Sequence, residues 1–384
     1  MLKKYSGLVL LTFALAAFSF WLFPKSSWIE FLNLKIYDRL LRLEYRLSGP
    51  PPTGDILLVL IDNDTLKNIP ERWPYSRRTI AEVIERLKGA GAKTIGFDFI
   101  FYGRSTPGED DRLKKALEAG PHPIVLGATL DDEGNQEASN LPEIRNGVLS
   151  GLVTKIQDSD GVIRKNITYL VSGQNARRGA LSWEMQILRS VGGVDVSSLS
   201  SKGDHVFFKT LKGEERDVPV DPDTQSFLIH YRAHSEDFKR LSFYRVWKGD
   251  FDPGRVKGKI VLVGLMSLKF QDVHRTPIGW LPGITLNANA LLTLTSRDFL
   301  RKVPAALEGL FNMGLVTAAA FFSIFLTRGK SKALVIFLIS AFVALSYLLL
   351  KGAYVWNYAY FPVVAPLLSY LIRRSAQFVP MVKK

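Results

Sequence analysis

The 384-residue sequence predicts an α/β fold, in which a mostly parallel sheet with flanking helices is combined with α-helical transmembrane segments. In the middle of the chain, fully apolar runs of strand length alternate with amphipathic helical patterns, as is typical of strands covered on both faces. Long uncharged runs lie near both ends of the chain. We therefore expect residues 25–303 to form a water-exposed domain held at a membrane by its two ends.

The charge distribution supports this division. The formal net charge is +14, but ten basic residues and one acidic residue, Glu308, lie in residues 1–23 and 304–384. The middle of the chain keeps 40 basic and 35 acidic residues, which is an ordinary solvated surface, so no nucleic-acid partner is expected. The absence of cysteine excludes disulfides, thiolate zinc sites and cysteine nucleophiles.

The first apolar run covers residues 8–23 and follows Lys3 and Lys4, so it is either a signal peptide or an uncleaved anchor. We favour an anchor within residues 1–24, because the small-residue triplet Ala14-Leu15-Ala16 lies inside the run and not at its end. Cleavage remains the alternative.

Three further spans are expected at about 304–326, 333–350 and 354–372, followed by a basic tail at 373–384. The loop at 328–332, the tail and the N-terminus are all basic, which places them in the cytoplasm. With four spans, both termini are then cytoplasmic and residues 25–303 lie outside. The chain is then expected to cross the membrane several times.

The elements of the middle segment follow from hydrophobic periodicity. The spacing of apolar residues predicts a helix over residues 26–47. This helix is either a stalk that transmits movement or dimerises, or a helix that simply packs on the domain. Residues 130–220 are rich in Gly, Ser and Asp, and there we expect antiparallel strands and loops. The other expected strands are 55–62, 93–99, 123–128, 227–231 and 260–264, and the other expected helices are 77–89, 110–119, 181–190 and 283–294.

Two acidic residues, Asp62 and Asp98, stand at the carboxyl ends of predicted strands, where open α/β sheets place their ligands. Together they could hold a divalent cation or the basic group of a ligand. The alternative is that Asp62, with Asp64, caps the next helix or turn, and that Asp98 accepts backbone hydrogen bonds. Two carboxylates are too few for a tight metal site, so metal binding and cofactors stay undetermined.

Other polar motifs have ordinary structural interpretations beside functional ones. Arg77 follows a suitable N-cap, Ser76, and either binds an anion or pairs with an acid. The segment 158–161 resembles the start of a calcium loop, but the twelfth position is Tyr169, so a turn is the better interpretation. Asp272 lies beside His274 with no nucleophile nearby in sequence. Phosphate-loop, dinucleotide and hydrolase motifs are absent, so we do not expect an enzyme.

With its motifs in this order, the chain resembles the second type of CHASE sensory domains, the cyclase- and histidine-kinase-associated extracellular sensors of bacteria. The resemblance covers residues 35–300. The matching pieces, in chain order, are Tyr37-Asp38 with Arg42 and Arg46, Ile61 to Leu66, Trp73-Pro74 with Arg77, Gly91 to Asp98, Asp158, Asp160 to Val162 with Arg164, Gly258 to Gly264, Asp272, Thr276-Pro277, and Pro282-Gly283 with Asn287, Ala288 and Asn289.

This resemblance implies a sensory role in a bacterial inner (plasma) membrane, with one span before the external domain and three after it. In the family the spans usually lead to a cytoplasmic cyclase, histidine kinase or protein kinase. Here the sequence ends at Lys384, shortly after the last predicted span. The resemblance therefore implies either a separately encoded output partner, such as a cyclase, a kinase or a regulator, or a purely regulatory role. It fixes no stimulus.

We expect a non-enzymatic membrane sensor whose external domain has two conformations. A ligand or partner binds these two conformations with unequal affinity. A homodimer is compatible with the stalk helix. A structural subunit that docks another envelope protein is the alternative, and a membrane-tethered hydrolase is the least favoured class. The candidate ligand contacts are Asp62, Asp64, Arg77, Asp98, Asp272 and Thr276.

Overall fold

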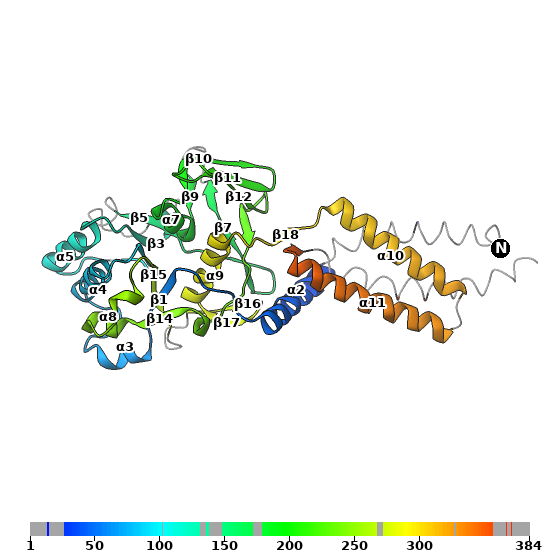
Figure 1. Ribbon diagram of the computed structural model, residues 1–384, viewed down its shortest axis with the longest axis horizontal. Helices are drawn as coiled ribbons and strands as arrows, with labels where there is room; N and C mark the ends of the chain where they lie inside the picture. The colour runs from blue at the N-terminus through cyan, green and yellow to red at the C-terminus, as the bar shows by residue number, and fades with distance from the viewer. Residues whose placement is uncertain are drawn as a thin grey trace, which may run out of the picture. The chain divides into compact units, whose positions relative to one another are not determined.

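A computed structural model describes residues 27–101, 103–130, 136–137, 148–171, 179–266, 272–325 and 328–355, and residues 14, 366 and 370. The chain divides into two compact units (Figure 1). One unit is Ser48–Phe299, and the other consists of Met1–Leu47 and Leu300–Lys384. The predicted first span, most of the predicted last span and the basic tail lie outside the described residues.

The unit Ser48–Phe299 is built on a seven-stranded sheet that is parallel except for its β3–β4 pair. The strand order is β14-β1-β15-β2-β3-β4, and β5 also pairs with β3. All six residues of β1 are buried, which explains its unbroken apolar sequence. The bounds are β1 (Ile56–Ile61), β2 (Thr94–Phe97), β3 (Ile124–Leu130), β4 (Gln136–Glu137), β5 (Leu149–Leu152), β14 (Lys239–Ser242) and β15 (Ile260–Leu265).

Helices cover both faces of this sheet (Figure 1). Successive side chains of β1 alternate between the two cores that these helices close. Leu57 and Val59 share one core with α4 (Arg77–Gly89), α5 (Pro107–Glu118) and α8 (Phe243–Lys248). Leu58 and Leu60 share the other with α7 (Trp183–Ser190) and α9 (Gly283–Ser296). Each fully buried Leu or Val contributes about 1.5–3 kcal/mol to these cores. A short helix, α3 (Asn63–Asn68), follows β1.

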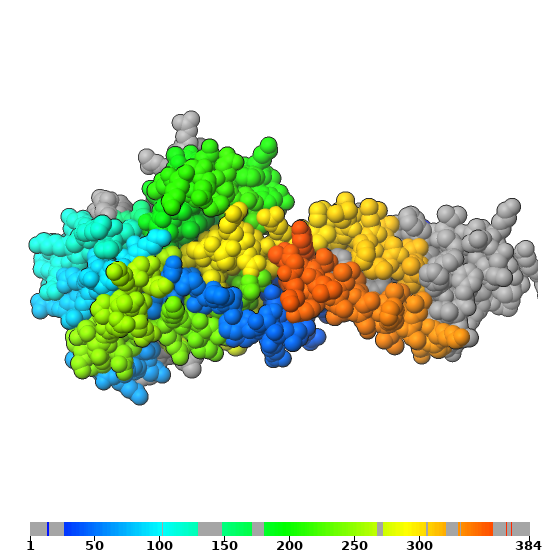
Figure 2. All heavy atoms as spheres, viewed as in Figure 1, coloured from blue at the N-terminus to red at the C-terminus, as the bar shows by residue number. Residues whose placement is uncertain are grey.

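A second, antiparallel layer covers the other side of α7 and α9 and closes a third core, which includes Met185, Leu286 and Phe227. Part of this layer is the three-stranded sheet β10–β12, the green lobe in Figure 2. Since α9 lies between two cores, twelve of its residues are buried. The bounds are β6 (Ile156–Gln157), β7 (Ile163–Ile167), β8 (Tyr169–Val171), β9 (Gly179–Leu181), β10 (Asp195–Lys202), β11 (His205–Lys209), β12 (Glu215–Pro219), β13 (Ser226–Leu228), β16 (Val273–Thr276) and β17 (Gly279–Pro282), with 3₁₀ turns at Ser235–Asp237 and Pro253–Arg255.

Glycines allow α7 and α9 to approach the sheet closely. A Cβ at Gly151 would lie 2.5 Å from the Cα of Trp183, and a Cβ at Gly264 would lie 2.8 Å from the Cβ of Ile284. Both distances are shorter than van der Waals contact, so no larger residue fits at these positions without movement of the helix.

The second unit contains α10 (Ala305–Phe325), α11 (Arg328–Lys351) and all but the last residue of α2 (Ser27–Ser48). The segment before α10 and the segment after α11 form a two-residue parallel ladder, β18 (Arg301–Lys302) with β19 (Tyr354–Val355). Among the described residues, one helix, Lys332–Lys351 within α11, is long and apolar enough to cross a membrane, and Ala306–Ala319 in α10 is a shorter apolar helix.

Most of the predicted elements are confirmed, including the helix at 26–47, the helix 77–89 with its Ser76 cap, and antiparallel strands within 130–220. The predicted strand 227–231 is shorter, and it pairs antiparallel with β7 outside the parallel sheet. The edge strands β5 and β14 were not expected. β14 reads KRLS and two of its residues are exposed, so it lacks the apolar run of a strand covered on both faces.

Candidate functional site at the carboxyl edge of the sheet

The parallel strands end at one edge, where the acidic residues predicted from the sequence are found. Asp62 follows β1 and Asp98 follows β2. These strands are not neighbours, because β15 lies between them. Two strand spacings amount to about 10 Å, so the two carboxylates do not share one cation. They belong to two different environments.

Asp62 is the N-cap of α3, as the capping interpretation predicts. Its Oδ1 accepts hydrogen bonds from Thr65 N at 2.9 Å, from Thr65 Oγ1 at 2.8 Å and from Ser242 Oγ at 2.9 Å. Thr65 Oγ1 also accepts a hydrogen bond from Tyr244 N at 3.2 Å. The Asp62 side chain therefore joins the end of β1 to β14 and α8.

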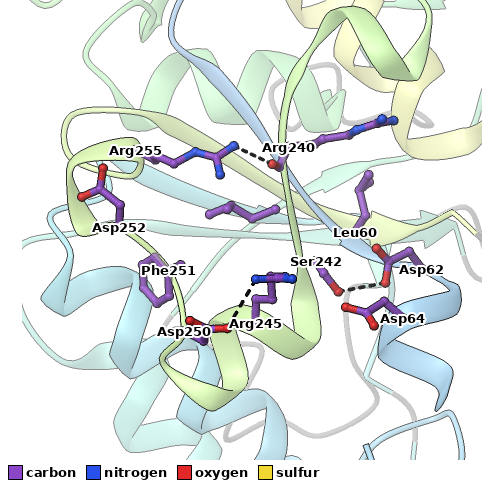
Figure 3. A pocket seen from close by; sticks show the side chains of 11 residues that line it. Leu60, Asp62, Asp64, Arg240, Ser242, Arg245, Asp250, Phe251, Asp252 and Arg255 are labelled. Carbon is purple, nitrogen blue, oxygen red and sulfur yellow. Dashed lines mark hydrogen bonds and ion pairs between the residues drawn. The ribbon is translucent and has the colours of Figure 1, made fainter. Parts of the chain in front are cut away.

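A surface pocket of about 500 Å³ opens beside Asp62 (Figure 3). This volume falls within the usual range for small-molecule sites. Figure 3 shows side chains of both charges around it. Its charged lining residues are Asp62, Asp64, Arg240, Arg245, Asp250, Asp252 and Arg255.

Most of these charges already have local partners. Arg245 Nη1 lies 3.3 Å from Asp250 Oδ2, and Arg255 Nη2 donates to the backbone oxygen of Arg240 at 2.9 Å. Asp64 accepts a hydrogen bond from Asn68 Nδ2 at 2.8 Å. In Figure 3 the Arg240 side chain extends away from the Arg245–Asp250 pair. Exposed pairs of this kind contribute little energy, so the pocket has no single dominant charge.

Asp98 lies in a more enclosed setting, on the side of the sheet covered by α7 and α9. Its backbone nitrogen donates to Val263 O at 2.9 Å, which fixes it at the end of β15 as well as β2. The side chain accepts a hydrogen bond from the Asn287 amide of α9. Desolvation, and then the negative charge of Asp272, raise the pKa of Asp98 to about 8, although Lys155 and the Asn287 bond oppose the shift.

A buried ion pair lies in the same group of side chains. Lys155 Nζ lies 3.1 Å from Glu184 Oε1, and Asn166 Nδ2 donates to Glu184 Oε2 at 2.8 Å. Glu184 is fully buried on α7. Sequence reasoning missed Lys155 and Glu184, and it named Asn287 only as part of the matching motifs and not as a site residue. Glu184 lies within a predicted helix between Trp183 and Met185, and nothing in its spacing distinguishes it from a solvated acid.

Asp272 reaches the first turn of α9. A Cβ at Gly283, the first residue of α9, would lie 2.7 Å from Asp272 Oδ1 and 2.8 Å from Oδ2, so this approach requires glycine. The partial positive charge of a helix N-terminus stabilises a carboxylate placed there. His274 Nε2 lies 3.0 Å from Asp272 Oδ1. We call Asp98, Asp272, Glu184, Lys155 and Asn287 the carboxyl-edge cluster.

The remaining predicted contacts have structural partners elsewhere. Thr276 is 3% exposed, and its Oγ1 donates to Gly279 O at 2.7 Å, which closes the β16–β17 hairpin. Arg77 lies at the start of α4, with Nη2 3.1 Å from Gly103 O and Nε 3.7 Å from Asp110 Oδ1. Desolvation lowers the pKa of Arg77. In the structure Arg77 therefore pairs with an acid, which is the structural one of its two interpretations.

The calcium-like motif is a turn between β6 and β7. Arg164 is buried and lies 2.8 Å from Asp158 Oδ2 and 2.8 Å from Asp160 Oδ2, so a guanidinium occupies the space between the two acids. Gly161 has a φ of 73°, as the turn requires. In the part of the chain that the structure describes, no three His, Asp or Glu side chains come together to hold a metal ion.

Comparison with known families shows to which family the chain belongs. The family model of the CHASE2 domain matches residues 9–325. The chain belongs to the CHASE2 domain family. This match confirms the resemblance stated from the motifs. CHASE2 domains are extracytoplasmic sensory domains and are not catalytic. The match also extends beyond residues 35–300 in both directions. Neither the comparison with curated proteins nor that with solved structures gives a match.

Proposed function

We propose that this CHASE2 protein is a membrane-bound extracytoplasmic sensor that binds its ligand at the carboxyl edge of the sheet and signals through its C-terminal helices. The observation that carries the proposal is the position of the carboxyl-edge cluster against α9. The Asp272 carboxylate lies against Gly283, the first residue of α9, and only residues 297–304 separate α9 from α10. A ligand that changes the cluster therefore acts on the element joined directly to the apolar helices.

Within this proposal the six predicted contacts are not equivalent. Asp98 and Asp272 interact with each other and face α9, so they are the first choice for ligand binding. Asp62 and Asp64 line the open pocket and are the second choice. Thr276 and Arg77 hold a hairpin and a helix start, so their effect on binding is indirect.

The output is proposed to be a separately encoded cytoplasmic cyclase, kinase or regulator, as the family resemblance implies. The test is crosslinking in native cells, purification in detergent and mass spectrometry of the captured partners. Capture of such an enzyme or regulator, with an output that Asp98→Asn alters, is the expected result. Capture of envelope proteins alone, through a domain that needs no small molecule, would overturn the sensor proposal in favour of an assembly subunit.

A further inference from the structure

A cavity of about 220 Å³ lies between strands β11 and β12 and the C-terminal ends of α7 and α9. Its walls are apolar side chains of the third core, namely Leu188, Phe208, Val218, Leu294 and Phe299. Four of these five are buried, and Leu188 is partly exposed. The cavity is therefore a gap in the core, and it reaches the surface beside the exposed residues Thr295 and Arg297.

The volume and the lining of this cavity suit one small apolar group. An apolar cavity of about 150 Å³ in a protein core binds benzene. The 220 Å³ found here therefore accommodates one aromatic ring with a short polar substituent. A nucleotide or a folded peptide segment needs a larger site.

The charged residues that line the cavity are two arginines and one aspartate. Arg216 and Asp217 belong to β12, and Arg297 follows α9. Asp217 already has basic neighbours, because its Oδ1 lies 4.0 Å from Arg297 Nη2 and its Oδ2 lies 3.6 Å from His205 Nε2. Arg216 pairs with Glu214, an exposed acid outside the lining. The side chain of Arg297 is 50% exposed and its contact with Asp217 is long, so Arg297 can turn to an anion at little cost.

Arg297 also has an unusual backbone conformation. It is the C-cap of α9 and lies in the left-handed region, with a φ of 59°, where helices usually end in glycine or asparagine. Residues held in this region without being glycine are concentrated at functional sites. The conformation also offers a clean substitution, because asparagine tolerates it and lacks the charge.

We infer that this cavity binds a small monocarboxylic acid whose apolar body has the size of one aromatic ring. The ring lies among the five apolar side chains, and the carboxylate lies at the opening, against Arg297 and Arg216. A guanidinium group binds a carboxylate through two parallel hydrogen bonds. The bound acid thereby replaces the long contact between Arg297 and Asp217.

The position of the cavity connects it to the segment that leads to the apolar helices. Thr295 belongs to the last turn of α9, and Arg297 and Phe299 lie between α9 and α10. Asp272 of the carboxyl-edge cluster lies at the first turn of this 14-residue helix, about 20 Å away along its axis. The inference therefore goes beyond the proposed function, because it adds a second binding site at the opposite end of α9.

The test is fluorine NMR of the full chain in lipid nanodiscs, with three probes that carry the same ring and differ in charge. The probes are para-fluorobenzoate, para-fluorobenzyl alcohol and para-fluorobenzylamine, which are negative, neutral and positive. We expect saturable line broadening of the benzoate, with an affinity at least about tenfold higher than that of the alcohol, because a charged hydrogen bond is gained. The amine should bind most weakly. Equal binding of the three probes, or a preference for the amine, would overturn the inference.

Variants at the opening locate the binding. Thr295→Trp places a large ring at an exposed position of the lining and should abolish the saturable broadening. Arg297→Asn should weaken benzoate binding about tenfold and leave binding of the alcohol unchanged, since only the charge is lost. Arg189→Gln, an exposed arginine of α7 outside the lining, is the matched control and should change nothing.

Thermal unfolding of each variant checks that the domain is still folded. If Thr295→Trp does not fold, Arg297→Asn still decides, because it keeps the turn at the end of α9. The absence of saturable broadening with the unmodified chain would overturn the inference, as would benzoate binding that is unchanged in Arg297→Asn. Partner capture is measured separately, so failure of this second site is distinguishable from failure of the sensor proposal.

Discussion

The ammonium group of Lys155 lies 3.1 Å from Glu184 Oε1, and the two side chains are 7% and 0% exposed. A pair this deeply buried is costly to desolvate, and its attraction offsets that cost only while both partners are present. The same Lys155 charge also opposes the upward pKa shift of Asp98. Lys155 therefore affects both the stability of the domain and the titration of the carboxyl-edge cluster.

Lys155→Met should lower the free energy of unfolding by about 3–5 kcal/mol, because it leaves the Glu184 charge buried without its cation. Thermal unfolding of the full chain in detergent, followed by tryptophan fluorescence, measures this. Adding Glu184→Gln should restore much of the loss, since the uncompensated charge is then gone. A double variant as unstable as the sum of the two single variants would show that the residues act independently.

Asp98 should make stability depend on pH. Its pKa is about 8 in the folded protein and close to 3.8 in the unfolded chain, so the folded state binds more protons between these values. The resulting stabilisation is fully present below about pH 4 and is lost as the pH rises to about 8, by at most about 1.4 kcal/mol per pH unit. Urea unfolding at several pH values should show this slope, and Asp98→Asn should flatten it. An unchanged slope in the variant would assign the effect to another group.

The sheet was predictable because its central strands are apolar on both faces. β1 and β15 read ILLVLI and IVLVGL, and such runs need no tertiary information to be recognised. The edge strand β14 was not predictable, because KRLS gains its strand conformation only from pairing with β1. For the candidate site, Asp98 and Asp272 were predictable from their positions in the motifs. Their partners Lys155 and Glu184 were not, since a pair 29 residues apart is brought together only by the fold.

Gly151→Ala should destabilise the domain strongly. The added Cβ would lie 2.5 Å from the Cα of Trp183, and that atom belongs to the backbone of α7, so α7 has to move away from β5. We expect a loss of about 1–3 kcal/mol or more in the same unfolding assay. Gly108→Ala is the matched control, because it lies in α5 with nothing within 4 Å of the new Cβ, and it should be neutral or slightly stabilising. Equal losses in both variants would contradict the packing argument.

Asp62→Ala should lower stability by about 1 kcal/mol through loss of the α3 cap. Asp62→Asn removes only the charge, since asparagine caps helices about as well as aspartate. Chemical denaturation of the two variants separates the effects. Signalling that is lost in Asp62→Asn while stability is retained would show that the pocket beside Asp62 takes part in ligand binding, and signalling that is retained would remove it from the site.

Tyr231→Phe should leave stability unchanged or raise it. The Tyr231 hydroxyl is fully buried and has no hydrogen-bond partner among the described residues, so its removal costs no hydrogen bond. Desolvation raises the pKa of this phenol well above its ordinary value, so the group stays neutral. A clear loss of stability, measured by thermal unfolding, would reveal a bound water or other partner at the hydroxyl.

The β18–β19 ladder limits how this protein can be cut and rejoined with related chains. Arg301 N donates to Ala353 O and Val303 N donates to Val355 O, each at 2.8 Å, so the chain entering α10 is hydrogen-bonded to the chain leaving α11. A chimera with its junction between residues 304 and 352 would pair one native strand of this ladder with a foreign one. The functional module for exchange is therefore discontinuous: a graft has to carry residues 301–303 and 353–355 together, or it separates the two strands that hold the helix ends in register.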